Sequence, residues 1–157
     1  MDLDPPEGAG FDVVVAAARL VRAALTDLGL TGAVKTSGAK GVHVFVPIAA
    51  HPTEDVAAAT RAIAARAERL DPVLATTTYV VADRGGKVFL DWSQNTGSKT
   101  TISPYSLRGR ELPMVAAPRT WEEVEAGAED PLALEQLRFE EVLERVQGEG
   151  DLFALEA

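Results

Sequence analysis

The sequence contains no cysteine and only two histidines among its 157 residues. Disulfide bonds and thiolate metal sites are therefore excluded, and a bound metal ion must be held by oxygen ligands or by those histidines. The chain also lacks any run of about 18 apolar residues, and its short acidic beginning is unlike a signal peptide. We therefore expect a cytoplasmic protein with no membrane partner.

Internal repeats and low-complexity tracts are absent as well. Hydrophobic residues make up 46% of the chain and charged residues 25%, which is typical of soluble globular proteins. The length suits one domain with a hydrophobic core and is too short for two. We therefore predict a single domain spanning residues 1–157.

Basic residues are outnumbered overall, with a net charge of −9, but the shortage is local. Residues 120–157 hold 12 Asp and Glu against 2 Arg, whereas residues 1–119 hold 12 acidic and 13 basic residues. The net charge of the whole chain is therefore a poor guide to the electrostatic field over any one cleft. A nucleic-acid partner is not excluded.

Some segments show apolar residues at helical spacing, and others are strand candidates joined by tight turns. We therefore expect an α/β fold of the α+β type, in which flanking helices pack on a mostly antiparallel central sheet. The predicted helices cover residues 11–28, 53–70 with Thr53 as N-cap, a short helix opened by a capping box at Thr120, and 134–146. The predicted strands cover residues 33–36 and 42–47, and residues 73–82 fit either a strand or a short helix.

The stretch from Lys87 to Arg110 reads as a β-hairpin with a polar turn and a basic exit. An apolar run, residues 88–90, delivers the carboxylate of Asp91, and the β-branched residues 100–102 are expected to form the second strand. An ordinary hairpin with a solvated turn fits this pattern equally well.

Two carboxylates stand near the beginning of the chain. Alternation along an extended segment places Asp2 and Asp4 on one face. Neighbouring ionised carboxylates repel each other unless they are solvated or bridged by a cation such as Mg²⁺ or Mn²⁺. A frayed, solvated terminus is the alternative and the commoner outcome for a single Asp-x-Asp at a chain end.

The turn from Ser37 to Gly41, followed by a strand containing His43, is the third polar element. Its glycines, serine and Lys40 can offer N–H groups, a hydroxyl and an ammonium group to a phosphate. It lacks the spacing of a Walker P-loop. Together with a third carboxylate from Asp91, these elements predict a two-metal site for phosphoryl or nucleotidyl transfer.

The order of these elements resembles the archaeo-eukaryotic primase superfamily and, more closely, the polymerase domain of bacterial ligase D. The resemblance covers nearly the whole chain, and its pieces are Asp-Leu-Asp-Pro-x-Glu-Gly (2–8), residues 35–43, 91–95, 104–108, 117–121, 137–139 and 150–153. Each piece alone is weakly specific, but the order and the spacing together are quite specific.

The resemblance implies a primase-like catalytic core with assigned residue roles. Its metal-binding, catalytic carboxylates match Asp2, Asp4 and Asp91, and the motif that binds the nucleotide's phosphates matches Ser37, Lys40 and His43. Further nucleotide contacts fall at Gln94, Lys99, Arg108 and Arg110. The implied activity is the addition of nucleotides, often ribonucleotides, from NTP or dNTP to DNA ends with Mn²⁺ or Mg²⁺. It would serve DNA repair by non-homologous end joining, alongside Ku and a DNA ligase domain.

The sequence departs from that family in two places. Pro6 stands where a glycine is usual, and the long N-terminal part that stacks on the base and grips the template has no counterpart here. We therefore expect the C-terminal part of such a domain, whether as a fragment, a subunit of a split enzyme or the product of a late-assigned gene start. Activity would then depend on the missing part.

Two other functions fit parts of the pattern. The basic stretch would also suit a non-enzymatic remnant that binds nucleic acid or another protein. An Asp-x-Asp phosphatase uses its first aspartate as a nucleophile. Such enzymes usually have a hydrophobic strand before the motif and Gly-Thr after its second aspartate, whereas Met1 precedes the motif and Pro5 follows it here.

Overall fold

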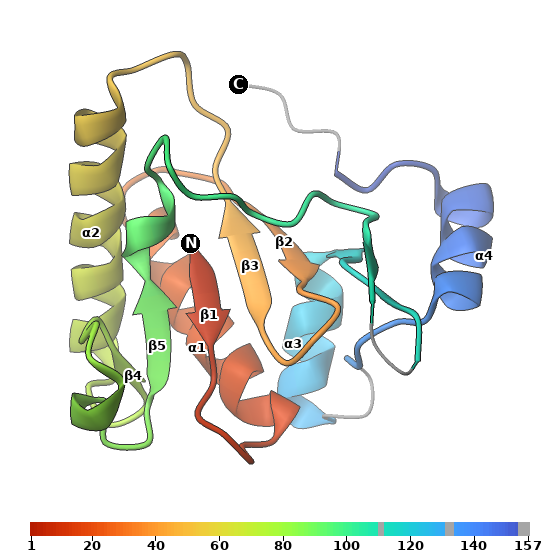
Figure 1. Ribbon diagram of the computed structural model, residues 1–157, viewed down its shortest axis with the longest axis horizontal. Coiled ribbons are helices and arrows are strands. Elements are labelled where there is room, and N and C mark those ends of the chain that lie inside the picture. The colour runs from red at the N-terminus through yellow and green to blue at the C-terminus, as the bar shows by residue number, and fades with distance from the viewer. Residues whose placement is uncertain (110–111, 131–133, 154–157) are drawn as a thin grey trace.

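The computed structural model describes residues 1–109, 112–130 and 134–153. A six-stranded sheet forms one layer, and three helices cover one of its faces (Figure 1). In spatial order the strands are β4 (Ala75–Thr76), β5 (Val88–Asp91), β1 (Asp2–Asp4), β3 (Val42–Phe45), β2 (Ala33–Thr36) and β8 (Pro118–Arg119). Only the β4–β5 pair is parallel within this sheet. The predicted fold class is confirmed.

Four helices accompany the sheet. They are α1 (Phe11–Thr26), α2 (Thr53–Leu70), α3 (Trp121–Glu129) and α4 (Phe139–Glu149), with short 3-10 turns η1 (Val81–Asp83) and η2 (Trp92–Gln94). Helix α4 stands apart from the sheet, beside a small ladder of β6 (Leu107–Arg108) and β7 (Met114–Val115) (Figure 1). No helix in the described ranges is both long and apolar enough to cross a membrane.

The first strand lies in the interior of the sheet, between β3 and β5. Leu3 is fully buried and belongs to the same core as Val42, Leu90 and the inner face of α1. Burying a leucine contributes about 2 kcal/mol, and pairing on both edges satisfies the backbone. The expectation of a frayed, solvated terminus is therefore wrong. Because side chains alternate along a strand, Asp2 and Asp4 face away from the helices.

The helix ends follow local chemistry with two differences from the prediction: α1 ends at Thr26 and not at residue 28, and α2 has another N-cap. Gly29, with φ 69°, ends α1, and the amide of Leu30 donates to the carbonyl of Leu25. Helix α2 covers the predicted residues, but Thr53 is its first helical residue and not its N-cap. Pro52 precedes the helix, and its carbonyl accepts the amides of Asp55 and Val56, so no side-chain cap forms.

The predicted hairpin over residues 87–110 is wrong. Strand β5 is already paired on both edges, with β1 and β4, so no edge remains for residues 100–102. The Asp91 side chain instead accepts the amide of Ser93 and caps η2, which turns the chain out of the sheet. Strand β6 then pairs with β7.

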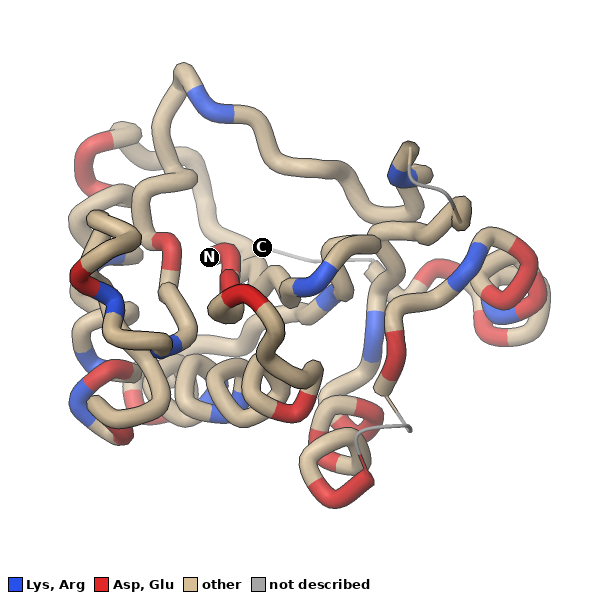
Figure 2. The backbone as a smooth tube through the Cα atoms, turned by 60° about the horizontal axis from the view of Figure 1, so that its bottom comes forward, with Lys and Arg blue, Asp and Glu red and all other residues tan. Residues whose placement is uncertain are grey.

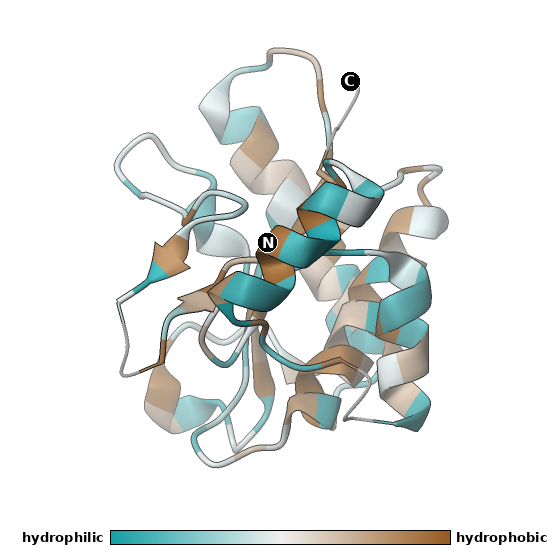
Figure 3. Ribbon diagram, turned by 90° about the vertical axis from the view of Figure 1, so that its right-hand side faces the viewer, coloured by the Kyte–Doolittle hydropathy of each residue, from teal (hydrophilic) through white to brown (hydrophobic). Residues whose placement is uncertain are grey.

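The acidic C-terminal part holds α3 and α4. Thr120 forms the predicted capping box with Glu123, through N–H bonds of 3.2 and 2.7 Å. Acidic positions recur along both helices (Figure 2), and α4 is amphipathic (Figure 3). Helix α4 begins at Phe139 and not at residue 134, because Leu137 and Arg138 are extended against β7, where the Val115 amide donates to the Leu137 carbonyl. The ambiguous residues 73–82 contain the short strand β4 and the start of η1.

Candidate functional site

A row of ionisable side chains crosses four neighbouring strands on the sheet face opposite the helices. The register pairs Lys35 with His43, His43 with Asp2, and Asp2 with Asp91. Residues directly opposite each other in antiparallel strands project to the same side and lie close together. The sheet therefore brings two of the predicted carboxylates and the predicted histidine side by side.

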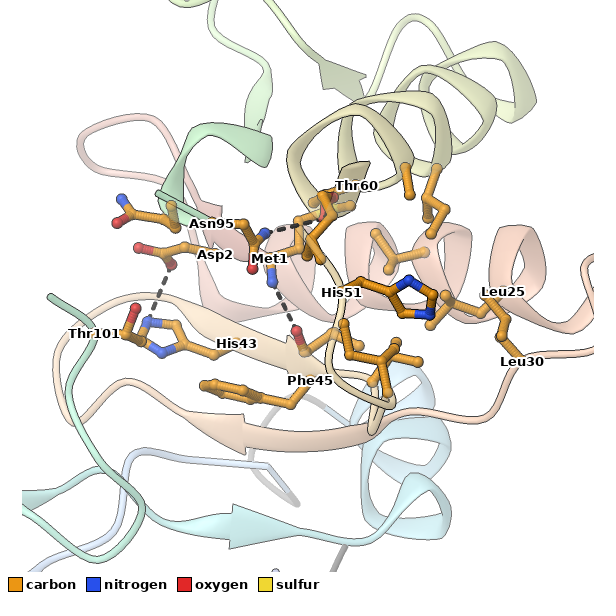
Figure 4. Close-up of a pocket in the computed structure, with 18 of the residues that line it drawn as sticks. Met1, Asp2, Leu25, Leu30, His43, Phe45, His51, Thr60, Asn95 and Thr101 are labelled. Atoms are coloured by element: carbon orange, nitrogen blue, oxygen red, sulfur yellow. Dashed lines mark hydrogen bonds and ion pairs between the residues drawn. The ribbon is translucent and has the colours of Figure 1, made fainter. Parts of the chain in front are cut away.

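Hydrogen bonds connect the first three members of this row. Lys35 Nζ lies 2.9 Å from His43 Nδ1, and His43 Nε2 lies 3.1 Å from Asp2 Oδ1 (Figure 4). Lys35 is fully buried and His43 nearly so. Burial lowers the pKa of Lys35 from 10.5 to about 8, while the charge of Asp2 raises it and that of Arg108 lowers it.

Asp91 is held in place by the turn that follows it. Its Oδ1 accepts the amide of Ser93 at 2.9 Å and the hydroxyl at 2.6 Å, and its Oδ2 accepts Gln94 Nε2 at 2.6 Å. Lys99 donates to the same Ser93 hydroxyl. Gln94 and Lys99 therefore lie near the predicted carboxylate and stabilise its position directly or through Ser93.

Asp4 is surrounded by cations. Its Oδ1 lies 3.2 Å from Lys40 Nζ and its Oδ2 lies 3.6 Å from Arg84 Nη1. The Arg84 guanidinium lies 3.8 Å from the centroid of the Phe89 ring, which holds it over the sheet. Sequence reasoning did not assign Arg84 to the site, because a Gly-Gly turn separates it from β5.

The Ser37–Gly41 turn has a compact, internally bonded shape. The Ser37 hydroxyl accepts the amides of Ala39 at 3.2 Å and Gly41 at 3.0 Å. Gly38 has φ 69°, and a Cβ there would lie 2.5 Å from Arg108 Cγ. A Cβ at Gly41 would lie 2.5 Å from the Leu3 carbonyl oxygen. Both glycines are therefore required for this close approach of backbone and side chains.

Gln136 joins the two ends of that turn from the other end of the sequence. Its Oε1 accepts the Gly38 amide at 2.8 Å, and its Nε2 donates to the Gly41 carbonyl at 3.2 Å. This residue was missed because no local pattern relates a glutamine to a turn almost a hundred positions earlier.

Most of the predicted site residues line one cavity of about 280 Å³, here called the polar pocket. Its lining includes Asp2, Asp4, Ser37, Lys40, His43, Gln94 and Arg108, with residues 100–102 of the loop that crosses above. Asp91 and Lys99 are not among the lining residues, although Asp91 stands opposite Asp2. Arg110 lies outside the described residues.

A larger apolar cavity of about 370 Å³ opens beside the polar pocket (Figure 4). Aliphatic side chains of α1, α2 and β3 line most of it, including Leu25, Val44 and Ile63. The two cavities have Asp2, His43, Gln94 and Thr101 in common, so they adjoin at the row of ionisable side chains.

The donor chemistry at this row suits a hard divalent cation. Asp2 and Asp91 are opposed carboxylates, and Mg²⁺ and Mn²⁺ prefer such oxygen ligands. In the described part of the chain, however, no group of three or more His, Cys, Asp or Glu side chains is arranged to hold a metal ion. Asp4, the third predicted ligand, is paired with Lys40 and Arg84 and would have to leave them.

Comparison with known proteins places the chain in one family. Residues 1–153 match the family model described as LigD, primase-polymerase domain. The multifunctional non-homologous end joining protein LigD of Mycobacterium bovis is 50% identical over 153 residues, which are 96% of this chain and 19% of that protein. The bifunctional LigD of Bacillus subtilis is 35% identical, over 96% of this chain and 24% of that protein. The chain thus spans about a fifth to a quarter of these relatives.

A solved structure supports the same assignment. The polymerase domain from Mycobacterium tuberculosis ligase D in complex with DNA superposes with a TM-score of 0.87 at 48% identity. The match covers 96% of this chain and 51% of that one. None of these matches is to a phosphatase. The chain belongs to the primase-polymerase domain family of LigD.

Proposed function

We propose that this chain supplies the metal- and phosphate-binding half of a nucleotidyltransferase site that adds NTP or dNTP to DNA ends. The observation that carries the proposal is the polar pocket, where carboxylates, a compact glycine turn and two basic side chains converge. The relatives are non-homologous end joining proteins by name, so the proposed setting is end joining with Ku and a DNA ligase domain as partners.

The basic side of the polar pocket suits a triphosphate. Lys40 and Arg108 supply positive charge, and the Ser37 hydroxyl and His43 supply hydrogen-bonding groups at the same wall. Charge-assisted hydrogen bonds to phosphate oxygens are roughly twice as strong as neutral ones. The cavity volume is close to the lower end of the ~300–1,000 Å³ range of small-molecule sites, so it suits the phosphates and not a whole nucleotide.

The carboxylate side of the pocket suits divalent cations. Asp2 and Asp91, with Asp4 after release from its cations, would hold Mn²⁺ or Mg²⁺. A bound cation of this kind would neutralise triphosphate charge and lower the pKa of an attacking hydroxyl. The protein's own part is to hold Asp91 rigidly, through Ser93 and Gln94, at the position opposite Asp2.

DNA is proposed as the second substrate. The solved relative was determined in complex with DNA, and this chain corresponds to about half of it. We therefore propose that the chain contacts a DNA end through the open sheet face and that full extension activity requires the remaining half of the domain.

The test is calorimetry of ATP binding with and without Mn²⁺, on the chain and on Asp91→Asn. The asparagine keeps an acceptor for the Ser93 amide but loses the charge, so Mn²⁺-dependent affinity should fall by at least about tenfold. Asp12→Asn, at an exposed carboxylate of α1, is the matched control and should change little. Equal affinity with and without Mn²⁺, or an unaffected Asp91→Asn, would refute the proposal.

A parallel DNA titration separates this function from a non-enzymatic remnant. Affinity for a DNA end that falls steeply with salt but is indifferent to Mn²⁺ and to Asp2→Asn would support a binding role alone.

A further inference from the structure

Lys35 is a buried lysine that forms no ion pair with a carboxylate of the described residues. It is fully buried in β2, and among the described residues none forms a salt bridge with it. Its polar contact is His43 Nδ1 at 2.9 Å, and its ammonium lies 5.6 Å from the centroid of the Phe45 ring. Lysines are almost never fully buried unless they are paired, so this contact calls for an explanation.

The chemistry of an ammonium group decides how the pair is bonded. A lysine ammonium has three donors and no acceptor, and a neutral imidazole has one donor and one acceptor. Burial lowers the pKa of Lys35 to about 8, so the ammonium form still predominates at pH 7. His43 Nδ1 must then accept, which leaves the ring proton on Nε2.

The opposite end of the ring fits the same arrangement. His43 Nε2 lies 3.1 Å from Asp2 Oδ1, an acceptor. The alternative tautomer would place an N–H against the ammonium of Lys35 and a lone pair against the carboxylate of Asp2. Both contacts would be repulsive, so the two neighbours favour one tautomer together.

We propose that Lys35 is a positioning residue that fixes the proton of His43 on Nε2, so that His43 presents one N–H donor to the polar pocket. That donor bonds to Asp2 in the structure described. The next step rests on the proposed function. When a nucleotide occupies the pocket, the same N–H group donates to a phosphate oxygen instead of to Asp2. Lys35 itself does not line the pocket and acts through the ring.

The direct test is the tautomer of His43, read from two-bond ¹H–¹⁵N correlation spectra of histidine-labelled protein at pH 7. The chain has two histidines, and His51→Gln assigns the spectrum. We expect His43 in the wild type to carry its proton on Nε2 and to have an unprotonated Nδ1. Lys35→Met should lower the population of that state, because Asp2 alone then favours it, whereas Lys87→Met, which removes a lysine away from the pocket, should preserve it.

A proton on Nδ1 in the wild type, as the other tautomer or as imidazolium, would overturn the proposal whether or not Lys35→Met folds. Unchanged His43 nitrogen shifts in a folded Lys35→Met would overturn it as well.

Nucleotide affinity tests whether His43, positioned by Lys35, donates to a bound phosphate. Lys35→Met should weaken Mn²⁺-dependent ATP binding by about tenfold. The double variant Lys35→Met/His43→Ala should bind no more weakly than His43→Ala alone, because Lys35 acts through the ring. Additive losses of ATP affinity in the double variant would show that Lys35 does not act through the His43 ring, and would overturn this part of the proposal. If the wild type binds no ATP while the tautomer is as expected, the proposed function fails and the positioning role of Lys35 stands.

Discussion

Asp2 and Asp91 stand directly opposite each other on β1 and β5, two antiparallel strands that are each paired on both edges. Two like charges at such close quarters repel. The structure offsets the repulsion by placing His43 against Asp2 and the hydrogen-bond donors of Ser93 and Gln94 against Asp91. The sheet therefore holds the two carboxylates opposite each other.

Replacing Lys40 by methionine should weaken triphosphate binding. The ammonium lies in the polar pocket, and its loss removes a charge-assisted contact to phosphate, so affinity should fall by about tenfold. The effect should be larger for ATP than for AMP, as calorimetry can show. Lys87→Met is the matched control. Equal affinities for Lys40→Met and Lys87→Met would contradict this role.

Replacing Gln136 by alanine should loosen the Ser37–Gly41 turn. The side chain bonds to both the Gly38 amide and the Gly41 carbonyl, so its removal should cost about 1–2 kcal/mol of folding free energy. We expect ATP affinity to fall as well, by roughly three- to tenfold. Gln147→Ala, at an exposed position of α4, should change neither quantity. A loss of stability with unchanged ATP affinity would show that the turn does not contact phosphate.

Between pH 8 and 10.5, the free energy of unfolding of the wild type should increase relative to that of Lys35→Met. The pKa of Lys35 is about 8 in the folded chain and 10.5 ordinarily, so within this window the folded state has released a proton that the unfolded state retains. Raising the pH then favours folding, by up to about 3 kcal/mol. Urea unfolding in EDTA measures the difference. A difference that stays constant from pH 8 to 10.5 would mean that the ammonium is not desolvated.

Glu123 should anchor the acidic C-terminal helices. Its carboxylate contacts Arg119 Nη1 at 2.7 Å and Arg145 Nη1 at 2.9 Å. Burial alone would raise the pKa of Glu123, but the Thr120 amide and the two guanidinium groups hold it below the usual 4.5. Glu123→Gln keeps the capping box, so its cost of about 2 kcal/mol would come from the ion pairs.

That cost has a defined pH dependence. Because the folded pKa of Glu123 is depressed, its stabilisation is present above pH 4.5 and is lost as the pH falls through the folded pKa. The stability gap between the wild type and Glu123→Gln should therefore narrow below that pH in urea unfolding. Glu144→Gln, at an exposed site in the middle of α4, is the matched control and should show a much smaller gap.

The sequence predicted the elements whose information is local. Helix α2, strand β2 and the α3 capping box were predictable because apolar spacing and cap residues lie within a few positions. The proximity of Ser37, Lys40 and His43 followed from a short turn between two strands. If the pairing of the two strands is extended from this turn, residue 35 falls opposite residue 43, so the contact between Lys35 and His43 was predictable as well.

The remaining features depend on contacts between distant segments. The hairpin predicted for residues 87–110 does not form, because β1 and β4 pair with the two edges of β5. No local sequence pattern reveals this pairing. Gln136 reaches its turn across the whole fold, and Leu134 is buried instead of starting a helix. Strand β1 is stable for the same reason, since its neighbours come from residues 42–45 and 88–91.

The central claim is that Asp2 and Asp91 hold a divalent cation beside a triphosphate bound in the polar pocket. Anomalous diffraction from crystals grown with Mn²⁺ and a non-hydrolysable ATP analogue tests it most directly. We predict a manganese peak between the carboxylates of Asp2 and Asp91, with the phosphates against the Ser37–Gly41 turn and Lys40. Manganese bound instead on the acidic faces of α3 and α4, with an empty polar pocket, would contradict the claim.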